Sequence, residues 1–359
     1  MTWRRIAAYL ALALLLPGPA PLLAQSADPD APAEAPTVTV LDFSDLPGWA
    51  ADDHAAALAT FTATCGDMRA PDWIAVCKMA KAQSPASART FFELFFSPVL
   101  IQDGTPALFT GYYEPELQGS RVQSARYRYP VYRMPPEAQV TRPWLTRAQI
   151  EQGQALAGRG LEIAWVDDPV ALMFVQIQGS GRILLPDGSH IRIGYRGDNG
   201  HPYASIGQEM VRRGIYKAHQ VSARVIGNWV KRNPVRGAEL LRHNPSYVFF
   251  REIRDVSPEA GPKGAMNRSL TAMRSLAIDP AYVPLGAPVW VEKAGFRGLR
   301  RLMVAQDTGS AIKGPQRADV FVGSGPGAGK LAGRIKDDGR LVVLLPIQRA
   351  YALLVEDET

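Results

Sequence analysis

The sequence predicts a mainly β protein that also contains helices. From about residue 105 onward, short apolar runs alternate with turns rich in Gly, Pro and Asp, a pattern typical of strands. The turn Pro186-Asp187-Gly188 joins two such runs and indicates a β-hairpin. Apolar residues at helical spacing are concentrated in two regions, 52–100 and 203–243. No internal repeat is evident.

The first part of the chain is expected to be helical, and strands are expected to follow it. Residues 52–100 are expected to be helical, and Thr90–Phe96 continues them as a buried helix or strand. The strands expected next are short apolar runs between turns: Leu108–Tyr113, Val131–Arg133, Ala171–Gln178, Ile183–Leu185 and His190–Tyr195.

The second half repeats this change of pattern. Helical spacing returns over residues 203–243, with a break expected at Asn233-Pro234 and an end before Asn244-Pro245, because proline cannot continue a helix. From residue 247 short strands are expected again. Leu331–Ile335 and Leu341–Leu345 are expected to form a second hairpin.

The N-terminus has the pattern of a cleavable export signal. Two arginines precede an apolar run, Ile6–Leu16, which is too short to span a bilayer. Cleavage is expected after Ala24, and residues 25–36 are expected to form a linker. No cysteine lies near Ala24 to carry a lipid, so we expect a periplasmic protein, with outer-membrane association left open.

The charge, cysteines and histidines of the sequence indicate whether nucleic acid, a disulfide or a metal is to be expected. The formal net charge of +6 falls to +4 without residues 1–24, and no basic run with interleaved aromatics suggests nucleic-acid binding. Cys65 and Cys77 are expected to form a disulfide in an oxidising compartment, with a pair of buried thiols as the alternative. The histidines are scattered, so no metal site is expected.

Two aspartates, Asp307 and Asp319, lie on either side of a loop rich in Gly and Lys, each beside a strand-like apolar run. Desolvation can raise the pKa of such a carboxyl group, which then keeps a proton to donate. Acid-catalysed cleavage of a glycosidic bond needs a group of this kind. The alternative is that one or both aspartates only fix the loop through hydrogen bonds to its backbone.

Other short motifs do not support a different chemistry. Residues 323–330 lack the spacing of a phosphate-binding loop, and 203–207 lack the first glycine of a nucleophile elbow. Ser310–Lys313 matches the Ser-x-x-Lys of acyl-transferring wall enzymes. The Ser-x-Asn and Lys-Thr-Gly motifs that this chemistry also needs are missing from the sequence.

Together, several segments resemble the family of membrane-bound lytic murein transglycosylase A, which carries a C-terminal three-aspartate domain. The resemblance extends over roughly residues 40–350. Three of the matching segments each contain one aspartate: Asp279 in Ala277–Gly286, Asp307 in Gln306–Gly309 and Asp319 in Ala318–Phe321. The other three are motifs that contain glycine: Phe109–Pro115, Val175–Gly181 and Tyr195–Gly200.

The resemblance implies a double-psi β-barrel domain with an inserted second β-rich domain and a groove between them. The barrel domain would comprise residues 37–113 and 252–359, and the insert residues 114–251. The family cleaves the bond between N-acetylmuramic acid and N-acetylglucosamine without water and leaves a 1,6-anhydro ring. Peptidoglycan glycan strands are therefore the implied partner, without a cofactor, and a monomer is expected. Complexes with wall-synthesis proteins are left open.

The resemblance also assigns roles to residues. Asp319 corresponds to the catalytic acid, which then acts as the base, and Asp307 to a residue that orients or tunes it. Asp279 is interpreted as structural. Thr110, Gly111 and Tyr112 match a substrate-binding segment, and Gln178 is a further candidate for substrate binding.

The sequence departs from the family pattern at Ser310, where a second glycine is common. Three rival functions are a hydrolase that uses Asp307 and Asp319 as acid and base, a non-catalytic, expansin-like glycan binder, and the acyl-transferring enzyme suggested by Ser310–Lys313.

Overall fold

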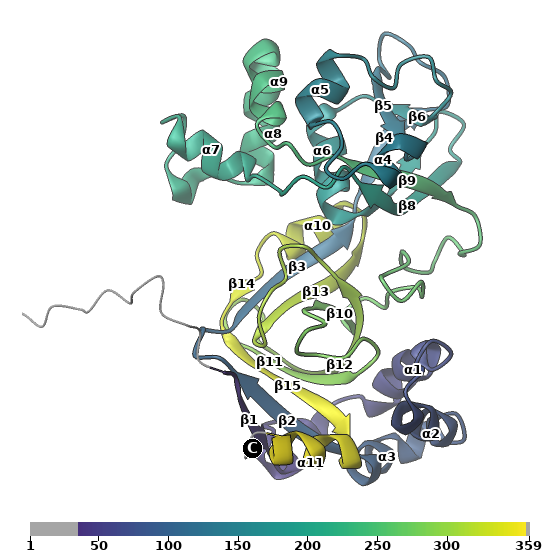
Figure 1. Ribbon diagram of the computed structural model, residues 1–359, viewed down its shortest axis with the longest axis vertical. Helices are drawn as coiled ribbons and strands as arrows, with labels where there is room; N and C mark the ends of the chain where they lie inside the picture. Colours follow the sequence, from purple (N-terminus) through teal and green to yellow (C-terminus); the bar gives the residue numbers. More distant parts are fainter. Residues whose placement is uncertain (1–34, 357–359) are drawn as a thin grey trace, which may run out of the picture. The chain divides into compact units, whose positions relative to one another are not determined.

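The computed structural model describes residues 35–356, so the expected signal segment and most of the expected linker lie outside the described residues. Two sheets, one of nine strands and one of six, dominate the described part of the chain (Figure 1). The prediction of a mainly β protein with helices is confirmed. Among the described residues, no helix is long and apolar enough to cross a membrane.

The nine-stranded sheet combines the two ends of the described chain. Its strand order is β1-β2-β15-β11-β12-β10-β13-β3-β14. Figure 1 shows its yellow-green strands arranged around a common centre. The strands are β1 (Thr37–Val40), β2 (Phe96–Gln102), β3 (Leu108–Glu114), β10 (Ser275–Ile278), β11 (Pro288–Lys293), β12 (Leu299–Thr308), β13 (Arg317–Ser324), β14 (Lys336–Asp337) and β15 (Gly339–Pro346).

The six-stranded sheet is built from the middle of the chain, in the order β5-β6-β4-β7-β8-β9. The Pro186-Asp187-Gly188 turn joins antiparallel β7 and β8, as the sequence predicts. The strands are β4 (Glu116–Ser120), β5 (Tyr129–Tyr132), β6 (Glu162–Val166), β7 (Ser180–Leu184), β8 (His190–Asp198) and β9 (Val248–Ile253).

The helices occupy the regions predicted from apolar spacing, together with some that were not predicted. The break at Asn233-Pro234 separates α8 from α9, as expected. The α-helices are α1 (His54–Thr64), α2 (Pro71–Ala80), α3 (Ala88–Phe95), α4 (Pro136–Val140), α5 (Arg147–Gln152), α6 (Pro169–Gln178), α7 (Ile206–Arg212), α8 (Ala223–Arg232), α9 (Pro234–Arg242), α10 (Gly325–Ala332) and α11 (Ile347–Glu356).

The predicted strand Ala171–Gln178 is wrong, because this segment forms most of α6. Asp168 begins the helix, since its side chain accepts hydrogen bonds from two backbone N–H groups of the first turn, and Pro169 occupies the first helical position. Gly179, with φ of 76°, ends the helix. The helix is largely buried, so its apolar residues do not follow a single face, and the helical period is lost from the sequence.

The predicted second hairpin is also wrong. Leu331 belongs to α10, and the short strand β14 pairs with β3 rather than with β15. Strand β15 instead pairs with β11 and β2, far away in the sequence. The turn-like sequence Asp337-Asp338-Gly339 therefore connects β14 and β15, two strands that pair with different partners and not with each other.

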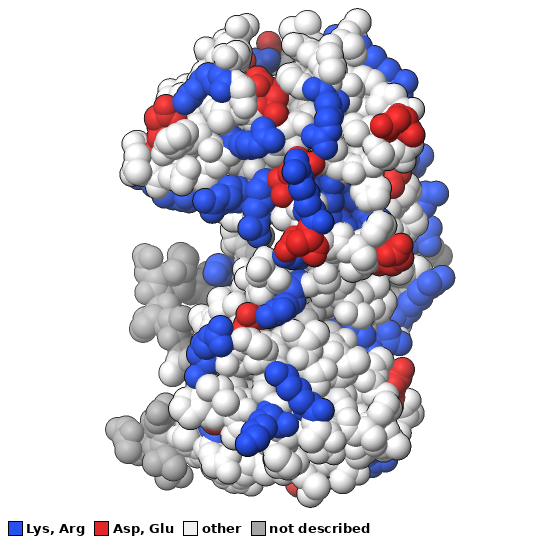
Figure 2. All heavy atoms as spheres, turned by 90° about the vertical axis from the view of Figure 1, so that its right-hand side faces the viewer, with Lys and Arg blue, Asp and Glu red and all other residues white. Residues whose placement is uncertain are grey.

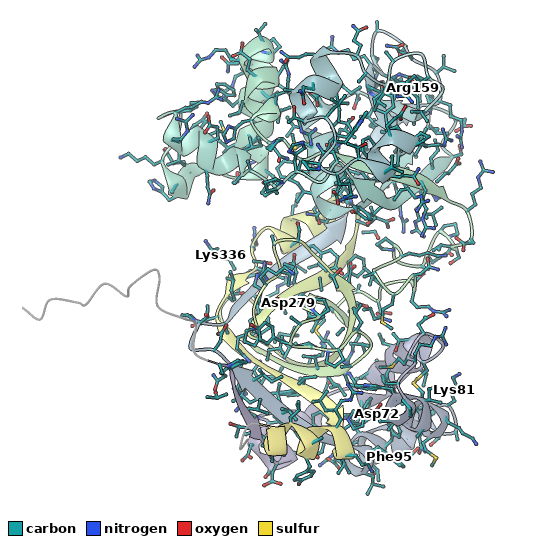
Figure 3. All side chains as sticks on the ribbon, viewed as in Figure 1. Asp72, Lys81, Phe95, Arg159, Asp279 and Lys336 are labelled. Atoms are coloured by element: carbon teal, nitrogen blue, oxygen red, sulfur yellow. A yellow bond between two sulfur atoms is a disulfide. The ribbon has the colours of Figure 1, made fainter. Side chains whose placement is uncertain are left out.

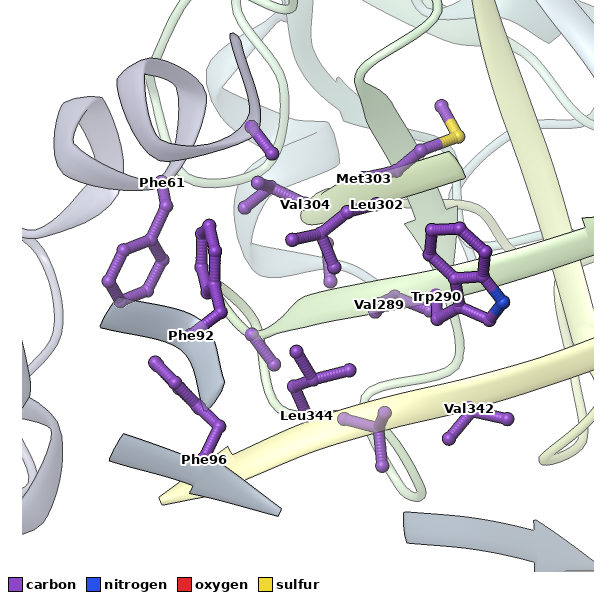
Figure 4. Close-up of a cluster of buried hydrophobic side chains, with 14 of the residues drawn as sticks. Phe61, Phe92, Phe96, Val289, Trp290, Leu302, Met303, Val304, Val342 and Leu344 are labelled. Carbon is purple, nitrogen blue, oxygen red and sulfur yellow. The ribbon is translucent and has the colours of Figure 1, made fainter. Parts of the chain in front are cut away.

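The main core lies between the N-terminal helices and the nine-stranded sheet (Figure 4). Phe61 from α1, Phe92 from α3 and Phe96 from β2 are almost completely buried and pack edge-on or tilted against one another. Trp290 of β11 and Leu344 of β15 belong to the same cluster. This packing anchors one side of the sheet that carries the candidate catalytic residues.

A buried ionic cluster connects the two sheets. Glu114, at the end of β3, is fully buried and accepts hydrogen bonds from Arg182 Nε on β7 at 2.8 Å and from Ser324 Oγ on β13 at 2.7 Å. Arg192 on β8 is 4 % exposed and approaches the same carboxylate to 3.0 Å. Both guanidinium groups also donate to the carbonyl oxygen of Ala260. The cluster therefore holds the end of β3 against β7 and β8, where the chain passes from one sheet to the other.

Cys65 and Cys77 form a disulfide that joins the end of α1 to α2. We expect titration of free thiols in the unfolded, unreduced protein to find none, and two reactive thiols would contradict this bond. Replacing both cysteines by serine should lower the free energy of unfolding by about 3 kcal/mol, as chain-entropy models give for a loop of similar length. Urea denaturation of both forms measures this difference.

Candidate active site

Three neighbouring strands position the candidate acid. In the register of the sheet, Asp319 of β13 lies between Thr110 of β3 and Ala277 of β10. Thr110 Oγ1 donates a hydrogen bond to Asp319 Oδ1 at 2.8 Å. Side chains alternate along a strand, so Phe321 points to the same face as Asp319, and its ring lies 5.3 Å from that of Tyr112. These rings form part of the apolar wall on that face.

Burial raises the pKa of Asp319 to about 6, well above its ordinary value. The hydrogen bond from Thr110 and the positive charge of Arg317 act in the opposite direction, while the charge of Asp307 adds to the rise. Desolvation is the dominant cause, since it disfavours the charged form of a carboxyl group. Asp319 therefore keeps its proton to a higher pH than an exposed aspartate does.

Asp307 has a different environment. The hydroxyl of Tyr112 donates to its Oδ2 at 2.9 Å, and the backbone N–H groups of Ala265 and Thr308 donate to its Oδ1, each at 2.9 Å. Burial raises the pKa of Asp307, and these three hydrogen bonds oppose the rise. Three donors from separate segments fix the orientation of the Asp307 carboxyl group, while burial still leaves its pKa above the ordinary value.

Gly111 and Gln178, also suggested by the sequence, bond to neither aspartate and instead shape or support the strand that carries Thr110 and Tyr112. Gly111 lies beside α10, and a Cβ at this position would lie 2.9 Å from the Cα atom of Ala332, so a side chain does not fit. Gln178 is not in the immediate contact of either aspartate: its Oε1 accepts the N–H of Tyr113 at 3.1 Å. It therefore ties the end of α6 to the strand that carries Thr110 and Tyr112.

Asp279, labelled in Figure 3, bonds to the loop that follows β12. Its carboxylate accepts the N–H of Gly314 at 3.0 Å and that of Ala281 at 3.3 Å, and Lys313 Nζ lies 3.6 Å away. Burial acts to raise the pKa of Asp279, but these donors outweigh burial and the pKa is lowered. Asp279 thus stays ionised and holds the loop that follows β12, while Ser310 lies exposed in that loop.

Sequence reasoning missed Arg317. Its Nη2 donates to Thr110 Oγ1 at 2.8 Å, and Thr110 in turn donates to Asp319, so the three side chains form a chain of hydrogen bonds. The only signal in the sequence is that Arg317 lies two residues before Asp319 and so shares its face of the strand. Among residues 35–356, no group of three or more His, Cys, Asp or Glu side chains could hold a metal ion.

Two family models and several known proteins match this chain. Residues 108–251 match the model of the MltA specific insert domain, and residues 274–345 match the 3D domain. A relative from Vibrio cholerae, named membrane-bound lytic murein transglycosylase A, is 34% identical over 266 residues and covers 70% of each chain.

Solved structures give the same result. The membrane-bound lytic murein transglycosylase from Agrobacterium tumefaciens has a TM-score of 0.77 at 34% identity and covers 88% of this chain and 99% of that chain. Escherichia coli MltA with bound chitohexaose has a TM-score of 0.64 at 27% identity and covers 86% and 94%.

The fold and the two matched domains place the protein in a class of wall-active enzymes built on a double-psi β-barrel with an inserted β-rich domain, and the predicted fold class is confirmed. The chain belongs to the MltA family of lytic murein transglycosylases.

Proposed function

We propose that the protein is a lytic transglycosylase that cleaves the MurNAc–GlcNAc β-1,4 bond of peptidoglycan and leaves 1,6-anhydro-MurNAc ends. The observation that carries this proposal is the contrast between the two carboxyl groups. Burial raises the pKa of both groups, but Asp319 has one hydrogen-bond donor among its side-chain contacts, whereas Asp307 is held by three donors. One group is suited to move a proton, and the other is suited to hold its position.

In the proposed reaction, protonated Asp319 gives its proton to the glycosidic oxygen as the bond from this oxygen to C1 of the muramyl sugar breaks. The carboxylate of Asp319 then takes the proton of the C6 hydroxyl as that oxygen bonds to C1. No water molecule is consumed. Thr110 and Arg317 orient the carboxyl group, and Asp307 and Tyr112 form the adjacent wall of the site.

We also propose the domain boundaries that the family resemblance implies. Residues 37–113 and 252–359 would form the barrel domain, and residues 114–251 the insert. The division of strands supports these boundaries, since the strands of the nine-stranded sheet lie before residue 115 and after residue 274. Thr110, Gly111 and Tyr112 would contact the sugars, with Gln178 supporting their strand. Export to the periplasm through residues 1–24 completes the proposal.

Mass spectrometry of the products released from purified sacculi tests the reaction. We expect 1,6-anhydro-muropeptides, because the muramyl C6 hydroxyl replaces water as the nucleophile. Reducing ends that incorporate ¹⁸O from labelled water would instead identify a hydrolase in which Asp307 and Asp319 act as acid and base. Binding without any product would identify a non-catalytic glycan binder.

The pH dependence of the rate follows from the pKa of Asp319. The acid works only when it is protonated, so kcat/KM should fall as the pH rises through about 6 and then by about tenfold per pH unit. Thr110→Val removes a donor to the carboxylate, which should raise the pKa of Asp319 and move this fall to higher pH. Initial rates of anhydro-muropeptide release from pH 4 to 9 measure both effects. Identical midpoints in the two proteins would contradict the assignment.

A further inference from the structure

A pocket of about 360 Å³ opens on the six-stranded sheet and is lined mainly by arginines. Its charged lining residues are Arg133, Arg196, Arg251, Glu252 and Arg254, and we call this site the arginine pocket. Figure 2 shows Lys and Arg side chains spread over one face of the molecule, most densely in its upper half, with fewer Asp and Glu side chains among them. None of these arginines belongs to the candidate active site described above.

The fold brings the arginines together from three separate segments. Arg133 directly follows β5 and forms an isolated bridge with Phe250 of β9. Arg196 lies at the register shift of β8, where the strand has an extra residue relative to β9. Arg251 lies on β9 opposite Gly194. The irregularity of β8 is therefore the local feature that places Arg196 beside the other two side chains.

Most of the positive charge of the pocket is not neutralised by the protein. Glu252 is already paired with Arg121 at 2.8 Å and with Arg254 at 3.0 Å. Arg133 donates to the carbonyl oxygen of Glu162, and Arg251 donates to the amide oxygen of Asn267. Within residues 35–356, no carboxylate lies within 4.0 Å of Arg133, Arg196 or Arg251, although other pairs on this surface are formed. Three guanidinium groups thus remain available to an anion.

The pocket connects to the candidate active site through one loop. Arg251 Nη2 donates to Asn267 Oδ1 at 3.3 Å, and the N–H of Asn267 donates to the carbonyl oxygen of Gly264 at 2.9 Å. The N–H of Ala265, in the same turn, donates to Asp307. A ligand in the pocket would therefore lie beside the turn that holds Asp307.

We propose that the arginine pocket binds the carboxylates of the peptide attached to the muramyl sugars. This inference rests on the proposed function, because it assigns the charged branch of the same substrate to a second site. Guanidinium groups bind carboxylates through paired N–H donors. Glu252 is already paired with Arg121 and Arg254, so the guanidinium groups left to meet a carboxylate are those of Arg133, Arg196 and Arg251. The volume is in the range that holds a short peptide segment.

The test compares two substrates in one protein. We expect Arg133→Gln/Arg196→Gln to lower kcat/KM on peptide-bearing glycan strands by about tenfold or more, since hydrogen bonds between charged groups are among the stronger ones. The rate on glycan strands from which an amidase has removed the peptides should stay unchanged. The matched control, Arg69→Gln/Arg224→Gln, removes the same charge from exposed positions outside the pocket and should change neither rate.

Direct binding separates this proposal from the proposed function. The free stem peptide is titrated calorimetrically into the wild-type protein and into both double variants. We expect it to bind the wild-type protein and the control variant with equal affinity, and Arg133→Gln/Arg196→Gln more weakly. This outcome supports the pocket even if the wild-type protein releases no anhydro products. Equal peptide affinity in all three proteins would overturn the proposal and identify an exposed basic surface. If Arg133→Gln/Arg196→Gln weakened only the binding of the protein to vesicles containing phosphatidylglycerol, the proposal would also be overturned and the pocket would be a lipid site.

Discussion

Asp319→Asn is expected to abolish most of the release of anhydro-muropeptides from sacculi. The amide has the size of the carboxyl group and can still accept the hydrogen bond from Thr110, but it cannot deliver a carboxylic-acid proton. General acid–base assistance is typically worth about 10²–10⁴-fold in rate, and the loss should lie toward the upper end because one group serves both steps. Initial rates, with glycan binding measured in parallel, provide the test.

Ser310→Ala and Asp307→Asn are the comparisons for this experiment. Ser310 is exposed in its loop, so its replacement should leave the rate unchanged. Asp307→Asn should slow the reaction, because Tyr112 and two backbone N–H groups would lose a charged acceptor. The loss should shift the wall of the site beside Asp319 and change the pKa of Asp319. Near-normal turnover by Asp319→Asn, together with loss of turnover in Ser310→Ala, would show that the residues have been assigned wrongly.

Glu114→Gln is expected to have the largest effect on stability. The substitution keeps the size of the side chain but leaves Arg192, which is 4 % exposed, and Arg182 without their carboxylate. Removing one partner from a buried ion pair costs about 3–5 kcal/mol, because the remaining charge stays desolvated. The free energy of unfolding in urea should fall by about this amount, and the contact between the two sheets should loosen first.

Glu116→Gln is the matched control, since Glu116 is exposed only two residues away and should change stability by less than about 0.5 kcal/mol. Hydrogen exchange would show where the Glu114 variant opens. Increased exchange confined to the N-terminal helices, with unchanged protection in β3, β7 and β8, would contradict a role for Glu114 in joining the sheets.

Local patterns were sufficient for several of the strands and for the apolar surroundings of Asp319. The turn at Pro186-Asp187-Gly188 predicts the β7–β8 hairpin, because glycine and aspartate favour the tight turn regardless of distant contacts. Alternation along β13 places Asp319 and Phe321 on one face, and the structure shows Phe321 almost fully buried there. The apolar surroundings expected to raise the pKa of Asp319 are present.

Local patterns failed where burial or pairing is decided elsewhere in the chain. Helix α6 is apolar on most sides because it packs against several elements, so its sequence has no helical period to detect. Strand β14 pairs with β3, more than 200 residues earlier, although the turn after it is typical of a local hairpin. A strand of two residues contains too little pattern to reveal its partner.

The sequence by itself determined the fold class, the hairpin, the pair of cysteines and the candidate aspartates, because each depends on neighbouring residues or on a recognisable family motif. Only the tertiary structure decided that Thr110 and Arg317 orient Asp319 and that Tyr112 holds Asp307. It also decided that three arginines from separate segments share one pocket. The physical reason is that these contacts depend on strand register and on a local bulge, which place side chains far apart in the sequence within hydrogen-bonding reach.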